Sequence, residues 1–149
     1  MTRDTWQRVF RRMLVREAGT GADAPAIAAA CRRLWERFAR QFSPLIGDAG
    51  VAAIFARSLH LSRRHIPELA PRRASDKSDK SVQSDPPFVL LERLLEQQQP
   101  APATEAAVAV LAMTGELLAS FVGEGLTTRL LRETWPDDFA ADDAEETNP

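Results

Sequence analysis

A chain of 149 residues, of which 44% are hydrophobic and 27% charged, has the size of one globular domain. Such a chain buries about two thirds of its surface on folding, so it needs neither disulfides nor a structural metal ion to keep a core. A formal net charge of −2 argues against a strongly basic polyanion binder, and the single cysteine, Cys31, excludes an internal disulfide.

The chain also lacks the signals of secretion and membrane insertion. No segment reaches 18 consecutive uncharged apolar residues, the length that a membrane span needs. Charged residues interrupt the apolar ones throughout the first 15 positions, which is unlike a signal peptide. A lone cysteine is typical of a reducing compartment. We therefore expect a soluble, cytoplasmic protein that does not enter a membrane.

The charges are unevenly distributed along the chain. Residues 1–75 contain 14 arginines and 6 acidic residues, whereas residues 76–149 contain 5 basic and 15 acidic residues. The two halves therefore carry net charges of +8 and −10. This asymmetry indicates either an anionic partner for the first half or pairing of the two halves within the fold. A third interpretation is that the exposed faces simply differ in composition.

Apolar residues recur with a helical period in the first 66 residues and predict three helices. The first is ended by the break over 19–25, and the second ends at Gly47, where a left-handed cap costs no Cβ clash. Asp48 is placed to cap the third helix, which Pro67 stops. The three stripes are Trp6, Val9, Phe10, Met13 and Leu14; Ile27, Cys31, Leu34, Trp35, Phe38, Phe42, Leu45 and Ile46; and Val51, Ile54, Phe55, Leu59, Ser62 and Ile66.

Residues 70–86 interrupt this periodicity. They are polar, aperiodic and rich in Ser, Asp and Lys, which predicts a flexible linker. A short helix follows and extends to Gln99, where Pro100 and Pro102 end it. Its inner face consists of Phe88, Leu91 and Leu95.

The remaining residues predict a long fifth helix and a short last one. Thr104 caps the fifth helix, and Gly115 in its middle permits a close helix crossing. Its apolar residues surround most of its circumference, so we expect it at the centre of the fold: Val108, Val110, Leu111, Met113, Leu117, Leu118, Phe121 and Val122. After a break at Gly123, the last helix carries Leu126, Leu130, Leu131 and Trp135. Pro136 closes it, and 137–149 is predicted to be an acidic, disordered tail.

Two short segments resemble each other at a spacing of 76 residues. Residues 42–48 read FSPLIGD and residues 118–124 read LASFVGE, which places Gly47 opposite Gly123. Each segment ends a long apolar helix and leads into a helix that carries an arginine, Arg57 or Arg129. One interpretation is a duplicated helix-turn-helix unit, and the other is chance similarity between two helix ends.

These patterns together predict an all-α fold. No segment alternates polar and apolar residues over the length of a strand. We expect a compact bundle of five or six helices with the long fifth helix at its centre. Residues 1–136 would form one domain, interrupted by the linker at 70–86. If the internal duplication is real, the bundle is pseudo-symmetric.

The chain lacks the residue constellations of common catalytic and metal sites. No Cys/His or His/carboxylate cluster has the spacing of metal ligands, there is no tyrosine, and no glycine-rich loop follows a strand. Cys31 lies on an apolar helix face, which is typical of a core cysteine. We therefore expect no catalytic residues, no cofactor and no metal ion.

The strongest candidate for a partner-binding surface is a cluster on the third helix. Arg57, His60 and Arg64 are spaced i, i+3 and i+7, and helical phase places all three opposite Phe55. Such a cluster can receive a phosphate or a carboxylate. The alternative is a solvated helix face with an incidental histidine. His65 lies at the edge of the buried face, where we expect it to cap the helix end.

His60 and the residues after it resemble histidine phosphotransfer domains over this short stretch. Those domains present their phosphoacceptor as an exposed histidine in the middle of a helix of a four- or five-helix bundle. A lysine usually stands three residues later and is followed by a glycine that gives access to the histidine. Here Arg63 stands at the lysine position, but Arg64 replaces the glycine. The resemblance implies phosphotransfer through His60, and the departure at Arg64 puts that access in doubt.

Arginines on the first two helices form a second candidate surface. They are Arg8, Arg11, Arg12, Arg32, Arg33, Arg37 and Arg40, and they lie opposite the apolar stripes. On an all-α scaffold such side chains can contact nucleic-acid phosphates. The negative net charge, an isoelectric point of about 5.7 and the absence of a recognition-helix pattern argue against this function.

The favoured function is therefore that of a small, non-catalytic regulatory or adaptor protein. It would bind another protein, with an acidic or phosphorylated surface, through its helical surface. Nucleic-acid binding through the first two helices is the alternative, and phosphotransfer through His60 is a third possibility; enzymatic activity is the least favoured. Nucleic-acid binding predicts a steep loss of affinity with rising salt concentration, which distinguishes it. The sequence specifies neither the identity of the partner nor an oligomeric state.

Overall fold

The computed structural model describes residues 1–69 and 87–140. In these ranges the chain forms helices α1 (Arg3–Ala18), α2 (Ala24–Arg63), η1 (Pro67–Leu69), α4 (Pro87–Glu96), α5 (Pro100–Val122) and α6 (Glu124–Thr134). A further helical turn covers 136–140. The described ranges contain no strand, and the prediction of an all-α bundle is confirmed. The predicted linker, 70–86, and residues 141–149 of the predicted tail lie outside the described residues.

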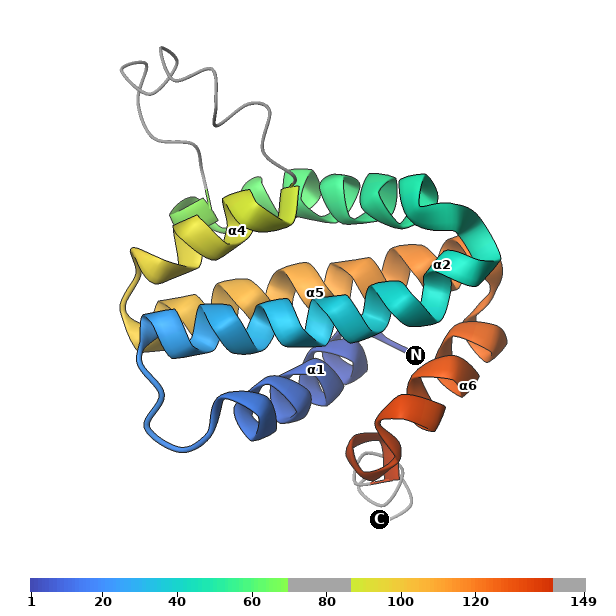
Figure 1. Ribbon diagram of the computed structural model, residues 1–149, viewed down its shortest axis with the longest axis horizontal. Helices are drawn as coiled ribbons and strands as arrows, with labels where there is room; N and C mark the ends of the chain where they lie inside the picture. Colours follow the sequence, from blue (N-terminus) through green and yellow to red (C-terminus); the bar gives the residue numbers. More distant parts are fainter. Residues whose placement is uncertain (70–86, 141–149) are drawn as a thin grey trace.

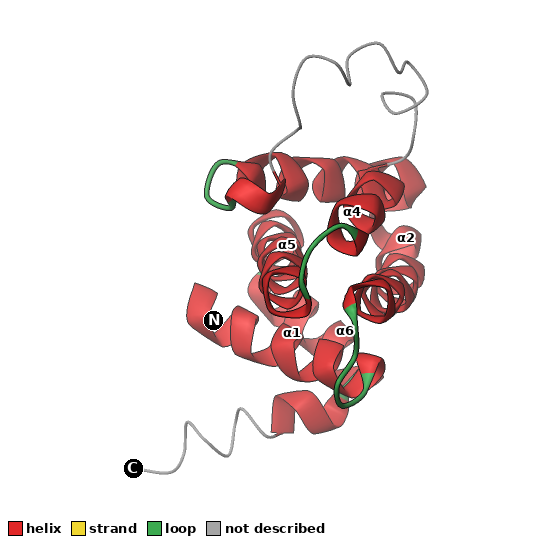
Figure 2. Cartoon of the chain, turned by 90° about the vertical axis from the view of Figure 1, so that its left-hand side faces the viewer, coloured by secondary structure: helices red, strands yellow, loops and turns green. Residues whose placement is uncertain are grey.

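The helices are arranged in three layers (Figures 1 and 2). α2 bends at Gly47 into a first part, 24–46, and a second part, 48–63. The first part of α2 and α5 run side by side in the middle layer. The second part of α2 and α4 lie on one side of this layer, and α1 and α6 lie on the other (Figure 2). α1 packs mainly on α5 and α4 packs mainly on α2, so both central helices are covered.

Side-chain caps determine where the first two helices begin. The hydroxyl of Thr2 accepts a hydrogen bond from the backbone N–H of Thr5 at 3.2 Å. The carboxylate of Asp23 accepts one from the backbone N–H of Ala26 at 3.0 Å. Each cap satisfies an N–H group of the first helical turn that has no acceptor within the helix.

The start of α5 differs from the prediction. α4 ends at Glu96, and α5 begins at Pro100, with Gln99 as its N-cap residue. Proline fits the first helical position because its φ angle is already helical and no N–H is needed there. Thr104 lies inside the helix, where its hydroxyl donates to the carbonyl of Pro100 at 2.9 Å. The prediction that Pro100 ends a helix and that Thr104 caps the next is therefore wrong.

α5 forms the centre of the core, as predicted. Its buried residues are Ala103, Ala106, Ala107, Val108, Val110, Leu111, Ala112, Thr114, Gly115 and Leu118. Trp6 and Phe10 of α1 pack directly on Gly115, where a Cβ atom would stand 2.9 Å from the Trp6 ring. On the other side of the middle layer, Trp35 of α2 stacks on Phe88 of α4 with 6.0 Å between ring centroids. These contacts join the three layers into one core.

Two glycines with similar backbone conformations end the long central segments. Gly47 has φ 81° and ψ 160°, and Gly123 has φ 105° and ψ 141°. Both φ values lie in a region that glycine adopts without a Cβ penalty. The two bends lie at the same end of the bundle (Figure 1). The segments that precede them, 24–46 and 100–122, are each 23 residues long.

The two halves of the chain also share a pattern of burial. At an offset of 76 residues, buried residues of α2 align with buried residues of α5, of α6 and of its C-cap, as in the pairs Leu34 and Val110, Phe42 and Leu118, Phe55 and Leu131, and Leu59 and Trp135. The short helix that begins each half covers the long helix of the other half, since α1 packs on α5 and α4 on α2. The bundle is thus pseudo-symmetric, which supports the duplicated helix-turn-helix interpretation.

Some residues near the bends and the C-terminus are not where periodicity places them. Leu45, Phe121 and Leu126 are predicted on inner faces, but their exposed fractions are 49%, 72% and 40%. All three lie within three residues of a glycine bend, where the chain turns away and the neighbouring layer ends. Conversely, Asp138 and Phe139 are buried in the turn 136–140, so packed structure extends into the predicted disordered tail.

By length and composition alone, α2 and α5 pass as possible membrane spans. The first part of α2 and α5 form the middle layer of the bundle, and 28% of the most apolar window of α2 and 50% of that of α5 are buried inside the fold. A helix that is apolar on most sides is expected at the centre of a globular core as well as in a membrane. Solubility and a cytoplasmic location therefore stay predictions.

Candidate functional site

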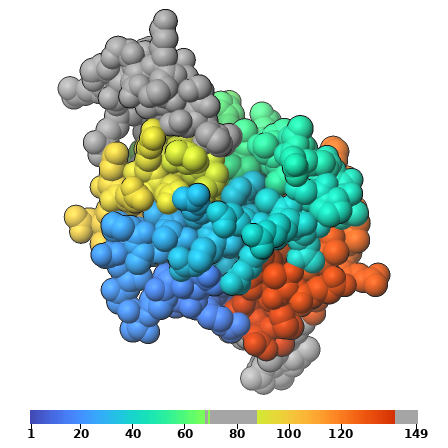
Figure 3. Space-filling model, in the orientation of Figure 1, coloured from blue at the N-terminus to red at the C-terminus, as the bar shows by residue number. Residues whose placement is uncertain are grey.

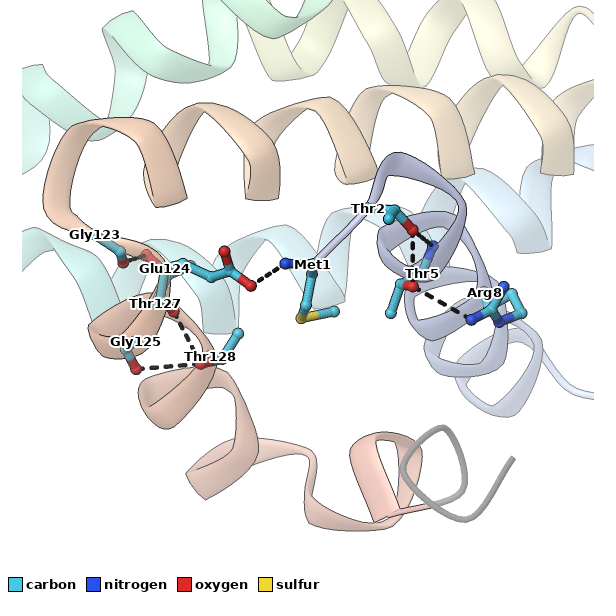
Figure 4. Close-up of polar contacts among 9 residues, drawn as sticks. All are labelled: Met1, Thr2, Thr5, Arg8, Gly123, Glu124, Gly125, Thr127 and Thr128. Atoms are coloured by element: carbon cyan, nitrogen blue, oxygen red, sulfur yellow. Dashed lines mark hydrogen bonds and ion pairs between the residues drawn. The ribbon is translucent and has the colours of Figure 1, made fainter. Parts of the chain in front are cut away.

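Ion pairs join the basic first half of the chain to its acidic second half. They include the amino group of Met1 with Glu124, Arg3 with Glu116, Arg11 with Glu105, Arg16 with Asp137 and Asp138, and Arg32 with Glu92. Figure 4 shows the first of these pairs, which links the start of the chain to α6. The hydrogen bonds between Arg11 and Glu105 lower the pKa of Glu105 and raise that of Arg11. Part of the charge asymmetry is therefore paired within the fold.

Most of the arginines predicted to contact nucleic acid also make polar contacts within the fold. Six of the seven make polar contacts within the fold: Arg8 with Thr5, Arg11 with Glu105, Arg12 with the carbonyl of Asp138, Arg32 with Glu36 and Glu92, and Arg33 and Arg37 with Glu17. Arg40 is exposed. Carboxylates thus lie among these arginines and reduce the positive potential that a phosphate-binding surface needs.

Arg57, His60 and Arg64 have a different environment. All three are exposed, as helical phase predicts, and they follow one face of the second part of α2 and its C-cap residue, Arg64. None of the ion pairs within 1–69 and 87–140 involves them. We call these three residues the cationic cluster. Its charge is not compensated within the described part of the chain.

An open groove lies between the second part of α2 and the last turns of α5. Its volume is about 320 Å³, and it is lined by Ala53, Ile54, Arg57, Leu117, Ser120 and Phe121. Phe121, exposed by 72%, and Arg57 of the cationic cluster line it from different helices. Figure 3 shows, at its right-hand side, the bend of α2 above α6 at this end of the bundle. The groove therefore combines an apolar surface with an uncompensated cation.

The pseudo-symmetry relates this groove to the surface between α6 and the first part of α2. At the 76-residue offset, Leu117 is equivalent to Gln41 and Arg57 to Glu133. Gln41 donates a hydrogen bond to the carbonyl of Leu130 at 2.7 Å and also contacts the hydroxyl of Thr134, which fastens α6 to the first part of α2. Leu117 has no polar group with which to fasten the second part of α2 to α5 in the same way. The polar contact that Gln41 makes with α6 thus has no counterpart at the groove.

The groove was not predicted from the sequence, although one of its lining residues, Arg57, was. Its two walls are separated by about 60 positions in the sequence, and Phe121 is expected inside the core. One signal was present in the alignment of 42–48 with 118–124, which pairs Phe121 with Leu45. Two large apolar residues in equivalent positions just before a bend are both exposed here.

The other residues considered for a chemical role are Cys31, the metal-ligating side chains and the two histidines. Cys31 is fully buried, and burial raises the pKa of its thiol to about 12, so the interpretation as a core cysteine is confirmed. Among the described residues, no three His, Cys, Asp or Glu side chains are placed to hold a metal ion. The C-cap residue of α2 is Arg64, whereas His65, predicted to cap this end, is exposed. Phosphotransfer through His60 stays a prediction.

The groove and the cationic cluster together differ from the rest of the described surface. Phe121 is the most exposed of the large hydrophobic side chains, and the cluster has no acidic partner there. An exposed aromatic ring beside an arginine is a combination enriched at the centres of protein–protein interfaces. No protein-family model, curated protein or solved structure matches the chain.

Proposed function

We propose that this protein is a small, non-catalytic adaptor or regulatory protein that binds an acidic amphipathic helix of another protein. The binding site is the groove between the second part of α2 and the end of α5, together with the cationic cluster beside it. One observation carries the proposal: the exposed ring of Phe121 and the uncompensated Arg57 line the same groove. In this role the protein is a binding module rather than an enzyme.

The apolar wall of the groove supplies most of the binding free energy. Removing a phenylalanine side chain from water contributes about 1.5–3 kcal/mol. The groove is shallow and open to solvent, with a volume of about 320 Å³, so it suits one or two side chains that a partner inserts from outside. An amphipathic helix offers such side chains at positions i, i+3 or i+4, and i+7.

The cationic cluster determines the orientation and the choice of the partner. Arg57 and Arg64 are seven residues apart, which corresponds to roughly 10 Å along a helix. Acidic residues about two turns apart on the polar flank of the partner helix match this spacing. Charges at the rim of an interface act mainly on the rate of association and on its salt dependence.

Site-specific crosslinking tests the proposal and identifies the partner in the same experiment. A photoreactive phenylalanine analogue replaces Phe121, and the matched control carries the same analogue in place of Leu45, which is also exposed but does not line the groove. After irradiation in the native host, mass spectrometry of the crosslinked peptides is expected to find one acidic amphipathic segment from position 121 and not from position 45. Crosslinks to nucleic acid, or identical products from both positions, contradict the proposal.

A titration with the identified segment then measures the contribution of each residue. Phe121→Ala is expected to weaken binding about 10- to 100-fold, because hot-spot aromatic residues contribute about 2 kcal/mol or more. Leu45→Ala is expected to leave the affinity unchanged. Equal losses in the two variants would mean that the segment binds elsewhere at this end of the bundle.

A further inference from the structure

One side of α1 carries three arginines at four-residue intervals. They are Arg8, Arg12 and Arg16, and we call them the arginine stripe. Residues four apart on a helix are neighbours on its surface, so the stripe extends for about 12 Å along α1. Asp4, one turn before Arg8, limits it at the N-terminal end. A peptide with several carboxylates is the natural complement of such a line of guanidinium groups.

The turn 136–140 attaches the end of the described chain to this stripe. Arg12 donates hydrogen bonds to the backbone carbonyl of Asp138 at 3.2 and 2.9 Å. The guanidinium group of Arg16 lies 3.7 Å from the carboxylate of Asp137 and 3.3 Å from that of Asp138. The chain therefore leaves the described fold directly beside two of the three arginines.

Two hydrogen bonds of the stripe go to neutral oxygen atoms. Arg8 donates to the hydroxyl of Thr5 at 3.3 Å, and Arg12 donates to the carbonyl of Asp138. A neutral acceptor does not offset the charge of a guanidinium group, and a hydrogen bond to a carboxylate is about twice as strong. Each guanidinium group also has further N–H donors. A carboxylate is therefore a better partner for both side chains than the acceptors of these two bonds.

The residues that follow the turn carry the matching charges. Residues 141–149, which lie outside the described residues, contain four acidic side chains and no basic one: Asp142, Asp143, Glu145 and Glu146. A chain of this length reaches at most about 30 Å, which exceeds the length of the stripe. Because the segment is joined to the turn, its effective concentration at the stripe is in the millimolar range. Weak charge pairs are therefore sufficient for binding.

We propose that the acidic segment 141–149 binds the arginine stripe of α1 and excludes nucleic-acid phosphates from it. α1 lies on the opposite side of the middle layer from the second part of α2, so this site is separate from the cationic cluster (Figure 2). The inference does not depend on the partner helix proposed for the groove. In this role the segment is an intramolecular competitor for a surface whose charge attracts polyanions.

A spin label on the segment tests where it binds. Thr147→Cys provides the attachment site, because the natural cysteine, Cys31, is fully buried. In NMR spectra of the full chain in low salt, the label is expected to remove more than about half of the amide signal intensity around Arg8. At about 0.5 M salt most of this loss should disappear, because the charges are screened. The matched control is a neutral-segment variant with the same label: Asp142→Asn, Asp143→Asn, Glu145→Gln and Glu146→Gln.

Two results of this measurement overturn the proposal. One is a signal loss around Arg8 that is as large in the neutral-segment variant as in the acidic chain. The other is a signal loss that is strongest at the cationic cluster, which would place the segment on the other side of the bundle.

Binding of a fluorescent single-stranded DNA oligonucleotide tests the competition. In low salt the neutral-segment variant is expected to bind it about tenfold more tightly than wild type, because phosphates replace the carboxylates on the stripe. Arg8→Gln in the neutral-segment background should remove most of this gain. Arg32→Gln is the matched control, because Arg32 is also exposed but lies on α2 and pairs with Glu36 and Glu92. Equal losses in the two arginine variants would reduce the effect to net charge and overturn the proposal, as would DNA binding that the neutral segment leaves unchanged.

Discussion

The indole ring of Trp6 lies directly against the backbone of Gly115, where α1 crosses α5. A Cβ atom on residue 115 would stand 2.9 Å from Cε3 of Trp6 and 3.1 Å from Cε2 of Phe10. Both rings are buried and stack on each other with 6.1 Å between their centroids, so neither has free space to move into. The absence of a side chain at this position therefore sets the distance between the two helices.

Gly115→Ala is expected to lower the free energy of unfolding by about 1–3 kcal/mol. Alanine is favoured over glycine inside a helix by about 1 kcal/mol, but overpacking against two fixed rings costs more. Gly125→Ala is the matched control: Gly125 also lies in a helix, and a Cβ there meets nothing within 4 Å. Denaturant unfolding should show a loss for the first variant and no loss for the second. Equal behaviour would mean that α1 does not cross at Gly115.

The glycine bends at Gly47 and Gly123 predict a loss of stability through backbone strain rather than through steric overlap. A Cβ atom at Gly47 or Gly123 meets nothing within 4 Å, but both residues have a positive φ that other residues avoid. Gly47→Ala and Gly123→Ala are each expected to cost about 1–2 kcal/mol through backbone strain. Because the bends are equivalent in the pseudo-symmetric bundle, the two losses should be similar. Thermal unfolding of both variants measures this, and an unchanged melting temperature in either one would contradict the bend at that residue.

Much of the fold follows from the sequence because burial has the period of a helix. Trp6, Phe42 and Phe55 are buried where their stripes place them, and Gly47 and Gly123 bend the chain where the sequence predicts. The sequence predicts a wrong helix boundary where one residue type fits both the end of a helix and the start of the next. Pro100 is read as the end of one helix, although proline is equally suited to the first turn of the next.

The groove was less predictable because it depends on where the layers end. Phe121 has the helical phase of a core residue, and only the turn of the chain at Gly123 exposes it. The same helical phase predicts the exposure of Arg57 correctly. A residue on the outward face of a helix needs no neighbouring helix to be exposed, whereas a residue on the inward face needs one to be buried. The burial of Asp138 also depends on contacts with α1, more than 120 positions earlier in the sequence.

Asp138 is a carboxylate buried at the end of the described chain. Neither of its carboxylate oxygens accepts a hydrogen bond from a described residue; Nη2 of Arg16 lies 3.3 Å from Oδ1, and Arg12 donates to the backbone carbonyl of Asp138 at 2.9 Å. Burial raises the pKa of Asp138, and the repulsion of Asp137 adds to this, whereas Arg16 and Arg12 act in the opposite direction. The net pKa is above its ordinary value. The folded state therefore favours the protonated form of this carboxyl.

The pH dependence follows from this direction. A group with a raised pKa contributes stability that is fully present below its unfolded pKa, about 4, and is lost as the pH rises through its folded pKa. Asp138→Asn removes this titration, so it is expected to raise the melting temperature at pH 7 by roughly 1–4 °C. The gain should shrink toward pH 4, and melting curves across this range measure it. A gain that does not depend on pH would contradict the role of ionisation.

The cationic cluster provides a prediction that separates binding from folding. Arg57, His60 and Arg64 are exposed and make no ion pair with a described residue, so replacing all three by alanine removes no contact of the core. The free energy of unfolding is expected to change by no more than about 0.5 kcal/mol. Arg40→Ala is the control, because Arg40 is also exposed but lies on the first part of α2.

Binding of the crosslinked segment should respond differently to these variants. The triple variant is expected to lose affinity in low salt, mainly through a slower association rate, and its difference from wild type should shrink as salt screens the charges. Arg40→Ala should bind like wild type at every salt concentration. A triple variant that unfolds would show that the three side chains belong to the fold and that their helical phase is wrong. One that folds and binds unchanged in low salt would make the cluster an ordinary solvated face, leaving Phe121 as the only determinant of the groove.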